Sequence, residues 1–295
     1  MSFKKVLFHT RFRELAYESL QSILELKAAG LEQIVLAYVI PREDVAFVPY
    51  GGYLHDHEDE LRETAEAQFE KWRETIEKAG VKVTVRIEVG APNANLLDIA
   101  EDHQVDLIVT GPKKRTIMEH IYVGRHILDV MRRSPVPVLM AKHQAEFETE
   151  KGVQTCTNTE MFKRPLLATD WSQPSLNALD ALVAMKNVVE TVLVAHVIRQ
   201  RLVQRADAAE VARLERESRS RLADYQNRLT EAGLKVETHL AQGRTVAEIL
   251  TLSRKQCASM IVMGRSGKDW FEEYWLGGVT HRVAEHSELP VMVVP

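Results

Sequence analysis

Four glycines near the end of the chain have the spacing of a loop that holds phosphate. Gly264 and Gly267 are separated by two residues, and Gly277 and Gly278 follow after nine more. Gly264 ends an apolar run, and the last two precede VTHRVAEHS, which has a helical pattern. Glycine lets a backbone approach a ligand closely, and a helix N-terminus offers N–H groups and partial positive charge. The spacing therefore favours a phosphate-bearing ligand over glycines that only form a turn, although neither GxxxxGK[ST] nor GxGxxG occurs.

An altered copy of this loop lies in the middle of the chain, in GPKKR and the later pair Gly124-Arg125. Lys114 stands at the position of Gly267, and Arg125 stands at that of Gly278. Side chains there block close backbone approach and fill the space of a phosphate. We favour a degenerate site that is kept as a structural partner. The alternative is a different anionic ligand, held by Arg11, Lys113, Lys114, Arg115 and Arg125.

The two copies belong to a repeat that covers most of the chain. KKVLFHTRFRELAYESL aligns with KRPLLATDWSQPSLNAL at an offset of 159, and VDLIVTGPKKR aligns with ASMIVMGRSGK at an offset of 153. This period is too long for a solenoid, so it indicates a duplicated domain. The expected organisation is a first domain at 1–145, a polar linker at 146–160 and a second domain at 161–295.

Each half alternates apolar runs with helical patterns, which is typical of a parallel sheet covered on both faces. The expected strands of the first half are 6–9, 33–40, 79–90, 106–111 and 135–141, and those of the second are 166–169, 191–198, 232–243, 259–264 and 290–295. A long amphipathic helix precedes each third strand. The apolar faces of these two helices are Leu61, Ala65, Phe69, Trp72 and Ile76 in one, and Val211, Leu214, Leu222, Tyr225 and Leu229 in the other. The prediction is an α/β fold with two doubly wound, Rossmann-like domains in tandem.

Composition excludes several classes of protein. The chain has 295 residues, 45% hydrophobic and 27% charged, with a formal net charge of −4, which indicates a globular protein that does not bind nucleic acid. No apolar run approaches the roughly 20 residues of a membrane span, so no membrane insertion is expected. Cys156 and Cys257 form no CxxC motif, which fits the cytoplasm, and Cys257 is expected to be buried.

The second half resembles the universal stress protein family, whose nucleotide-binding pattern is G-x2-G-x9-G-[S/T]. The opening LLATDWSQPS, then AHVI, QGRTVAEIL and the final PVMVVP also resemble that family. The resemblance covers both halves apart from the linker, as in the tandem members. One departure is Gly278, which stands where the family has Ser or Thr and so lacks a hydroxyl donor to phosphate.

The resemblance implies that ATP, or AMP or ADP, binds in the second half, with Mg²⁺ as a possible companion. Thr169 and Asp170 would contact the adenosine end, and Val197 would pack near adenine. The positions implied for ribose and phosphates are Met263, Gly264, Ser266, Gly267, Gly277, Gly278 and Val279, with Thr280 nearby. A role in stress response or signalling follows. The alternatives are a scaffold or carrier that binds an anionic ligand or partner protein through the first half, and a weak ATPase, which is disfavoured because no carboxylate–base pair is evident.

Partner expectations follow from the last strand of each half, PVPVLMA and PVMVVP. An unpaired sheet edge must be covered or paired, and in the resembled family these strands pair domain to domain. An intramolecular pseudo-dimer is therefore expected, with a further homodimer and an unidentified protein partner also open. His55 and His57 are interpreted as solvated residues before a helix and not as metal ligands. The aromatic residues Trp270, Phe271, Tyr274 and Trp275 are expected to pack against the domain.

Overall fold

The computed structural model describes residues 1–12, 16–47, 52–111, 125–142, 144–149, 152–265 and 276–295. The elements of the first half are β1 (Lys5–His9), α1 (Ala16–Ile23), the 3-10 helix η1 (Leu24–Ala29), β2 (Gln33–Pro41), α2 (Arg42–Val45), β3 (Ala46–Phe47), β4 (Gly52–Tyr53), α3 (His55–Lys78), β5 (Lys82–Gly90), α4 (Pro92–Asp102), β6 (Leu107–Thr110), α5 (Arg125–Arg133) and β7 (Val138–Met140). The hairpin β8 (Gln144–Thr149) and β9 (Gly152–Thr157) follows, and it begins two residues before the region expected to be the linker.

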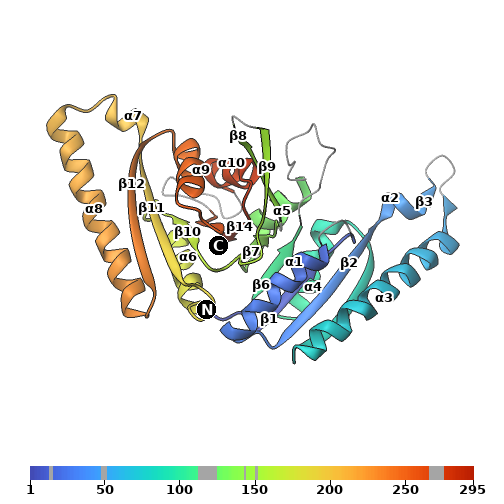
Figure 1. Ribbon diagram of the computed structural model, residues 1–295. Coiled ribbons are helices and arrows are strands. Elements are labelled where there is room, and N and C mark those ends of the chain that lie inside the picture. Colours follow the sequence, from blue (N-terminus) through green and yellow to red (C-terminus); the bar gives the residue numbers. More distant parts are fainter. Residues whose placement is uncertain (13–15, 48–51, 112–124, 143, 150–151, 266–275) are drawn as a thin grey trace.

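The described elements of the second half repeat the order of the first, apart from η1, β3 and β4 (Figure 1). Its elements are β10 (Pro165–Ala168), α6 (Gln173–Ala184), β11 (Thr191–Arg199), α7 (Gln200–Val203), α8 (Ala208–Glu231), β12 (Lys235–Gly243), α9 (Thr245–Lys255), β13 (Met260–Gly264), α10 (Gly278–His286) and β14 (Val291–Val294). The expected α/β fold with two doubly wound domains in tandem is confirmed.

One sheet of ten strands passes through both halves, in the order β12-β11-β10-β13-β14-β7-β6-β1-β2-β5. Within each half all the pairs are parallel. Val6 of β1 pairs with Ile34 and Leu107, and Leu166 of β10 pairs likewise with Leu193 and Ile261. The first strand of each half is therefore the point where the strand order reverses, which is where such sheets bind ligands.

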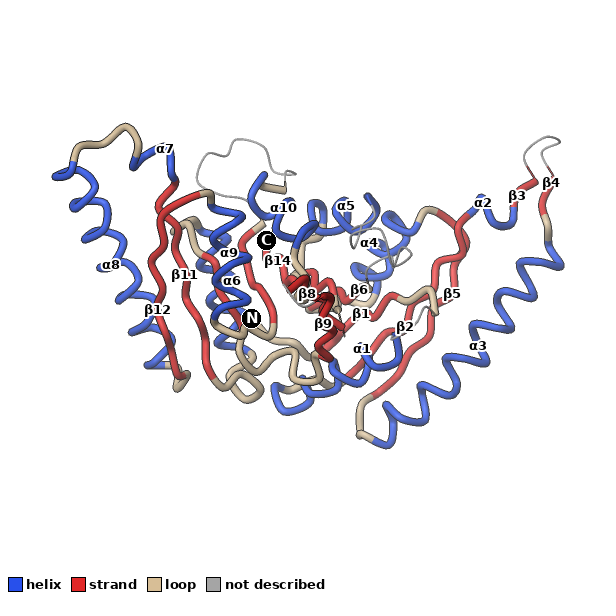
Figure 2. The backbone as a smooth tube through the Cα atoms, turned by 45° about the horizontal axis from the view of Figure 1, so that its top comes forward, coloured by secondary structure: helices blue, strands red, loops and turns tan. Residues whose placement is uncertain are grey.

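The helices cover both faces of this sheet, as the tube in Figure 2 shows. One apolar core contains buried residues of α1, α3, α6 and α8, and the other contains those of α4, α5, α9 and α10. The predicted faces are largely confirmed, since Phe69, Trp72 and Ile76 of α3 and Leu222 and Leu229 of α8 are buried. Each core contains residues of both halves, so the apolar packing on each face of the sheet continues from one half to the other.

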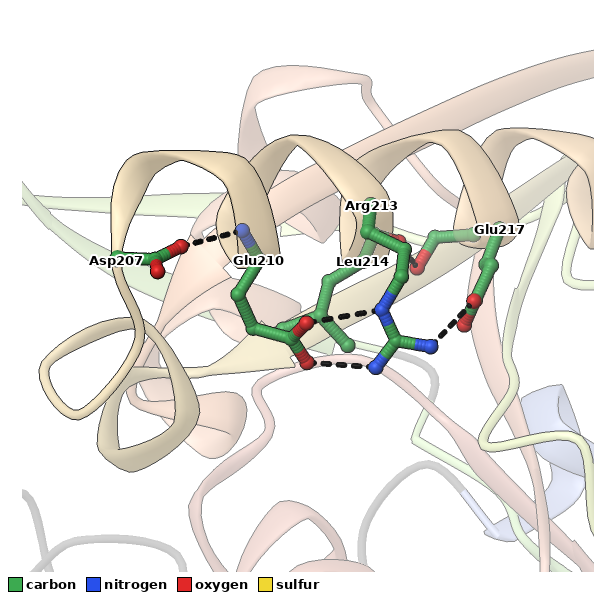
Figure 3. Close-up of polar contacts among 6 residues, drawn as sticks. Asp207, Glu210, Arg213, Leu214 and Glu217 are labelled. Atoms are coloured by element: carbon green, nitrogen blue, oxygen red, sulfur yellow. Dashed lines mark hydrogen bonds and ion pairs between the residues drawn. The ribbon is translucent and has the colours of Figure 1, made fainter.

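The long helix α8 begins at a capped turn, shown in Figure 3. The Asp207 carboxylate accepts a hydrogen bond from the Glu210 N–H at 2.8 Å, which satisfies one of the unpaired donors of the first turn. Arg213 then donates to both oxygens of Glu210 and to Glu217. The hydrogen bond from Arg213 lowers the pKa of Glu210. The equivalent helix α3 has Leu54 as its N-cap and no side-chain cap bond.

The two halves are joined by the pairing of their last strands. β14 lies antiparallel to β7, with Val291, Met292 and Val293 opposite Met140, Leu139 and Val138. All of these side chains are buried. The expectation that these strands pair domain to domain within one chain is confirmed, and neither remains an edge of the sheet.

Two local expectations are wrong. Cys257 is exposed, because it lies in the turn between α9 and β13 with φ of 50° and does not point into the core. Gln104 occupies the same turn of the first half with φ of 49°. His55 and His57 lie in the first turn of α3 and not in a loop before it, because the helix begins at His55. The described helices include none with both the length and the apolar character to cross a bilayer.

A buried lysine lies at the junction of the halves. Lys142 follows β7, is 2% exposed, and donates from Nζ to the carbonyl oxygen of Ser287. Ser287 is the C-cap of α10, where helix carbonyls carry partial negative charge. Burial lowers the pKa of Lys142 from 10.5 to about 7, and the nearby charge of Glu288 opposes that shift.

This lysine makes the stability of the protein depend on pH. Between about pH 7 and pH 10 the unfolded chain holds the Lys142 proton more tightly than the folded chain does, so stability falls as pH is lowered through this window. We expect the free energy of unfolding to fall by on the order of 2–4 kcal/mol across it, and Lys142→Met to remove most of that slope. Urea unfolding at a series of pH values measures this. The exposed Lys235→Met is the control and should keep the wild-type slope; parallel curves for wild type and Lys142→Met would contradict the prediction.

Candidate functional site

The sequence-predicted residues that the structure describes lie at the carboxyl edge of the second half of the sheet. Thr169 and Asp170 follow β10, Val197 lies near the end of β11, and Gly264 ends β13. β10 lies between β11 and β13, so the ends of these three strands meet at the point where strand order reverses. Ser266 and Gly267 lie outside the described residues.

Gly264 has no room for a side chain, and the reason lies in the fold. An added Cβ would lie 2.7 Å from the backbone carbon of Pro174 and 2.7 Å from the Ser175 nitrogen, both in the first turn of α6. These are backbone atoms, which cannot move aside as a flexible side chain does. Gly264 therefore allows α6 to pack directly against the end of β13, whatever it does for a ligand. Around Gly111, its counterpart in the first half, no atom of the described residues lies within 4 Å of an added Cβ.

The N-terminus of α10 lies at this edge of the sheet. Gly277 is the N-cap, with its N–H donated to the carbonyl oxygen of Arg265 at 2.9 Å. The first intrahelical bond runs from the His281 N–H to the Gly277 carbonyl, so the N–H groups of Gly278, Val279 and Thr280 precede it. We call Gly264, Gly277, Gly278 and Val279 the glycine cradle. Its backbone donors suit an anion.

Gly278 differs from Gly264 because an added Cβ there would meet no atom of the described residues within 4 Å. The fold therefore does not require glycine at 278, and a hydroxyl-bearing residue would fit. Thr280 does not replace that hydroxyl, since its side chain is buried and donates to the Gly264 carbonyl at 2.9 Å. That bond ties the first turn of α10 to the end of β13.

The side chains of Thr169 and Asp170 shape the turn from β10 into α6. The Thr169 hydroxyl accepts hydrogen bonds from the Trp171 N–H at 3.1 Å and the Ser175 hydroxyl at 2.5 Å. Asp170 Oδ1 accepts from the Ser172 N–H at 3.1 Å and from its hydroxyl at 2.6 Å. Ser172 in turn caps α6. Both predicted residues thus order the loop that forms one wall of the site.

An apolar wall completes the site on one face of the sheet. Val197 and Met263 are 6% and 5% exposed, and both belong to the core that also contains residues of α9 and α10. Leu276 and Val279 pack against the same core at the start of α10. An apolar wall beside backbone N–H donors suits a ligand with one flat apolar part and one anionic part.

Sequence reasoning missed an aromatic cluster beside this loop. The Trp171 ring lies 4.4 Å from the His196 ring and 5.3 Å from Tyr225, and the Arg221 guanidinium lies 5.9 Å from the Trp171 centroid. His196 Nδ1 is 2.8 Å from the Thr169 carbonyl oxygen, so the ring also holds the loop. Trp171 has φ of 69°, a conformation that is uncommon outside glycine. The available signal was the repeat, which aligns Trp171 with Phe12 at φ of 52°.

The first half lacks most of this arrangement in the part that the structure describes. Arg11, at the position of Asp170, lies 4.0 Å from Asp44 of α2. Phe12 packs among Tyr38, Phe69 and Trp72 at centroid distances of 5.3, 4.8 and 5.4 Å. Of the other cations proposed for an anionic ligand, Lys113, Lys114 and Arg115 lie outside the described residues, and of Arg125 only the backbone, at the start of α5, is described.

Metal-ligating side chains do not cluster in the part of the chain that the structure describes. No set of three His, Cys, Asp or Glu side chains there is placed to hold an ion. The ring of His55 lies 4.7 Å from that of Tyr53, and His57 Nδ1 lies 3.4 Å from Glu60. The aromatic residues between Trp270 and Trp275 lie outside the described part of the chain.

Comparison with known families decides the membership of the chain. The model of the universal stress protein family matches twice, at residues 2–142 and 161–295. The chain belongs to the universal stress protein family. The two matches make it a tandem member, and they leave out the segment with the β8–β9 hairpin.

Curated relatives match the chain one domain at a time. A universal stress protein of Methanocaldococcus jannaschii is 28% identical over 156 residues, which cover 48% of this chain and 96% of the relative. A universal stress protein of Bacillus subtilis is 29% identical over 147 residues, covering 45% of this chain and 99% of the relative. Each relative therefore has about the length of one half.

A solved structure resembles the whole chain. The crystal structure of a universal stress protein from Archaeoglobus fulgidus is 22% identical, with a TM-score of 0.72, covering 100% of this chain and 99% of that one. At this identity the likeness supports the fold alone. The likeness extends over both halves of the chain.

The packing role of Gly264 can be tested without any ligand. We expect Gly264→Ala to lower the free energy of unfolding by about 1–3 kcal/mol, because its Cβ would overlap the backbone of α6. Urea unfolding of the ligand-free protein measures this. The matched control is Gly111→Ala, which has open space and should change stability by less than about 0.5 kcal/mol. Equal effects at the two positions would contradict the packing explanation.

Proposed function

We propose that the second half, residues 161–295, binds an adenine nucleotide and that the protein acts in stress response or signalling through its nucleotide-bound state. The observation that carries this proposal is the N-terminus of α10, whose first N–H groups precede the first intrahelical bond, beside the reversal point of the strand order; no described atom lies within 4 Å of an added Cβ at Gly278. Membership of the universal stress protein family adds support, since the pattern G-x2-G-x9-G is kept in this half.

The parts of the ligand are assigned by chemistry. The glycine cradle takes the outer phosphates, because backbone N–H groups and the helix dipole stabilise negative charge. Val197 and Met263 form the apolar wall for the base. Thr169 and Asp170 bound the adenosine end, and the family resemblance assigns Ser266 and Gly267 to the ribose and phosphates. ATP is the proposed ligand, with AMP and ADP as shorter members of the same class.

We propose that Mg²⁺ binds only as a complex with ATP. The groups that the cradle presents are N–H donors, which fit phosphate oxygens and do not fit a bare cation. A companion Mg²⁺ would therefore be held mainly by the phosphates. This chain's own residues bind and orient the nucleotide. The Asp170 carboxylate is engaged with Ser172, so we assign it to holding the loop and not to proton transfer.

The remaining parts of the proposal concern location and partners. We place the protein in the cytoplasm, where the exposed thiol of Cys257 stays reduced. The proposed domain boundaries are 1–145 and 161–295, with 146–160 between them. The alternative function is a carrier of another anion through the first half; Arg11, the described side chain of that cation set, already lies beside Asp44. A protein partner would respond to nucleotide occupancy of the second half.

The first test determines which of the two halves binds ATP. We expect titration calorimetry to show one ATP site, and Gly277→Asp to abolish it because a carboxylate at the cradle repels phosphate. Aspartate is a favourable N-cap, so α10 should still form. The matched control is Gly124→Asp at the equivalent position of the first half, which should bind ATP as wild type does. Wild type that fails to bind millimolar ATP with Mg²⁺ would falsify the proposal.

A second variant should improve the site. Gly278→Ser restores the hydroxyl that the family has at this position, and its side chain meets nothing within 4 Å. A hydrogen bond to a charged group contributes about 1.5–3 kcal/mol, so we expect ATP to bind about 10- to 100-fold more tightly. Gly278→Ala is the control, since it restricts the backbone equally and adds no hydroxyl. If both variants change affinity alike, position 278 does not face phosphate.

Native mass spectrometry of the purified protein separates the proposed function from its alternatives. Co-purified AMP, ADP or ATP supports a nucleotide-binding protein. An unrelated anion, retained by the Gly277→Asp variant, would favour the carrier role of the first half. Steady ATP turnover that is lost in Gly277→Asp would instead indicate an ATPase.

A further inference from the structure

The arginine that follows Gly264 reaches from the second half into the first. Its Nη1 donates to the carbonyl oxygen of Ser134 at 2.8 Å and to that of Arg132 at 3.2 Å. These carbonyls lie at the C-terminal end of α5, where the peptide dipoles leave partial negative charge. Arg265 therefore caps a helix of the other half.

The backbone of the same arginine is held inside the second half. Its N–H donates to the Val294 carbonyl of β14 at 2.7 Å, and its carbonyl accepts the N–H of Gly277 at 2.9 Å. Gly277 is the N-cap of α10 and a member of the glycine cradle. Arg265 thus connects the start of the cradle, the strand at the junction and the end of α5.

A second cation makes the opposite crossing. Lys142 of the first half donates to the carbonyl of Ser287 at the end of α10. Ser134 and Ser287 are equivalent in the repeat, at the offset of 153 that also relates α5 to α10. Each half therefore supplies a cation to the C-terminal end of the same helix in the other half.

Arg265 and Lys142 do not occupy equivalent positions in the repeat. This difference determines which candidate site is linked to the opposite half. Position 112, which corresponds to Arg265, is proline, and position 295, which corresponds to Lys142, is also proline. One cation comes from the residue next to the glycine cradle, whereas the other comes from the end of a strand. The contact that Arg265 makes between the halves therefore links α5 to the candidate site of the second half and not to that of the first.

We propose that Arg265 is a positioning residue through which the first half holds the glycine cradle of the second half. The proposal rests on the proposed nucleotide binding. Because the cradle and the end of α5 share one residue, nucleotide that orders the cradle also stabilises the end of α5, and an intact junction raises nucleotide affinity in return. Arginine suits this role because its guanidinium stays charged and its terminal nitrogens each carry two N–H groups, so that Nη1 serves both carbonyls here.

Calorimetry and hydrogen exchange together test this coupling in the full-length protein. For wild type we expect saturating ATP to slow amide exchange in the segment 125–141 of the first half, including the Ser134 N–H that donates to Val130. Arg265→Met removes the cross-domain donors with little change in volume. We expect it to weaken ATP binding roughly five- to tenfold and to remove the ATP-dependent change in segment 125–141.

Two further variants control for charge and for folding. Arg265→Lys keeps the charge and can satisfy one carbonyl, so it should fall between wild type and Arg265→Met and still fold. Arg228→Met removes an arginine that pairs with Asp180 on the surface of the same half, at 3.1 Å, and should behave as wild type. A thermal melt of each variant reports on folding separately from affinity.

The outcomes distinguish this inference from the function on which it rests. If wild type binds ATP and segment 125–141 shows no change, the coupling is wrong although the nucleotide site stands. The coupling is also wrong if Arg265→Met lowers the melting temperature alone and leaves ATP affinity and exchange in 125–141 as in wild type. If wild type does not bind ATP, both proposals fall. If Arg265→Met does not fold, the coupling is tested by comparing wild type with Arg265→Lys. The comparison uses ATP affinity and the ATP-dependent amide exchange of segment 125–141.

Discussion

The antiparallel pairing of β7 with β14 is the constraint on which the rest of the molecule depends. A strand at the end of a sheet has unpaired backbone groups, and here each half supplies the partner that the other lacks. The pairing makes one sheet of two and lets both apolar cores continue through it. It also brings the C-terminal ends of α5 and α10 within reach of cations from the opposite half.

Duplication left the two halves alike in fold and unlike in chemistry. Gly111 follows β6 and Gly264 ends the equivalent β13, yet among the described residues helix backbone lies against an added Cβ at Gly264 and not at Gly111. Arg11 lies where Asp170 orders the loop of the second half. The aromatic residues Phe12 and Trp171 keep the same left-handed backbone in both halves. The fold accommodates both sets of loop residues because the sheet and the two apolar cores are built from strands and helices that the halves share.

Most of the fold followed from the sequence because its signals are local and periodic. Apolar runs alternating with helical patterns predicted the strands, and the repeat predicted the same topology twice. The candidate site was predicted from glycine spacing and resemblance, and the structure gathers its described residues at one edge. Cys257 was misjudged because a positive φ in a turn leaves no local pattern. The second role of Gly264 could not be predicted either, since it depends on α6, about ninety residues earlier in the chain.

By itself the sequence determined the order of elements, the duplication and the half that keeps the glycine pattern, because each depends on residue type and spacing along the chain. Only the tertiary structure decided what those residues contact. It showed that the Thr280 hydroxyl is bonded to Gly264, that Gly278 has open space, and that Arg265 reaches Ser134. These contacts join segments far apart in sequence, and they exist because two sheets meet edge to edge and bring the ends of two equivalent helices together.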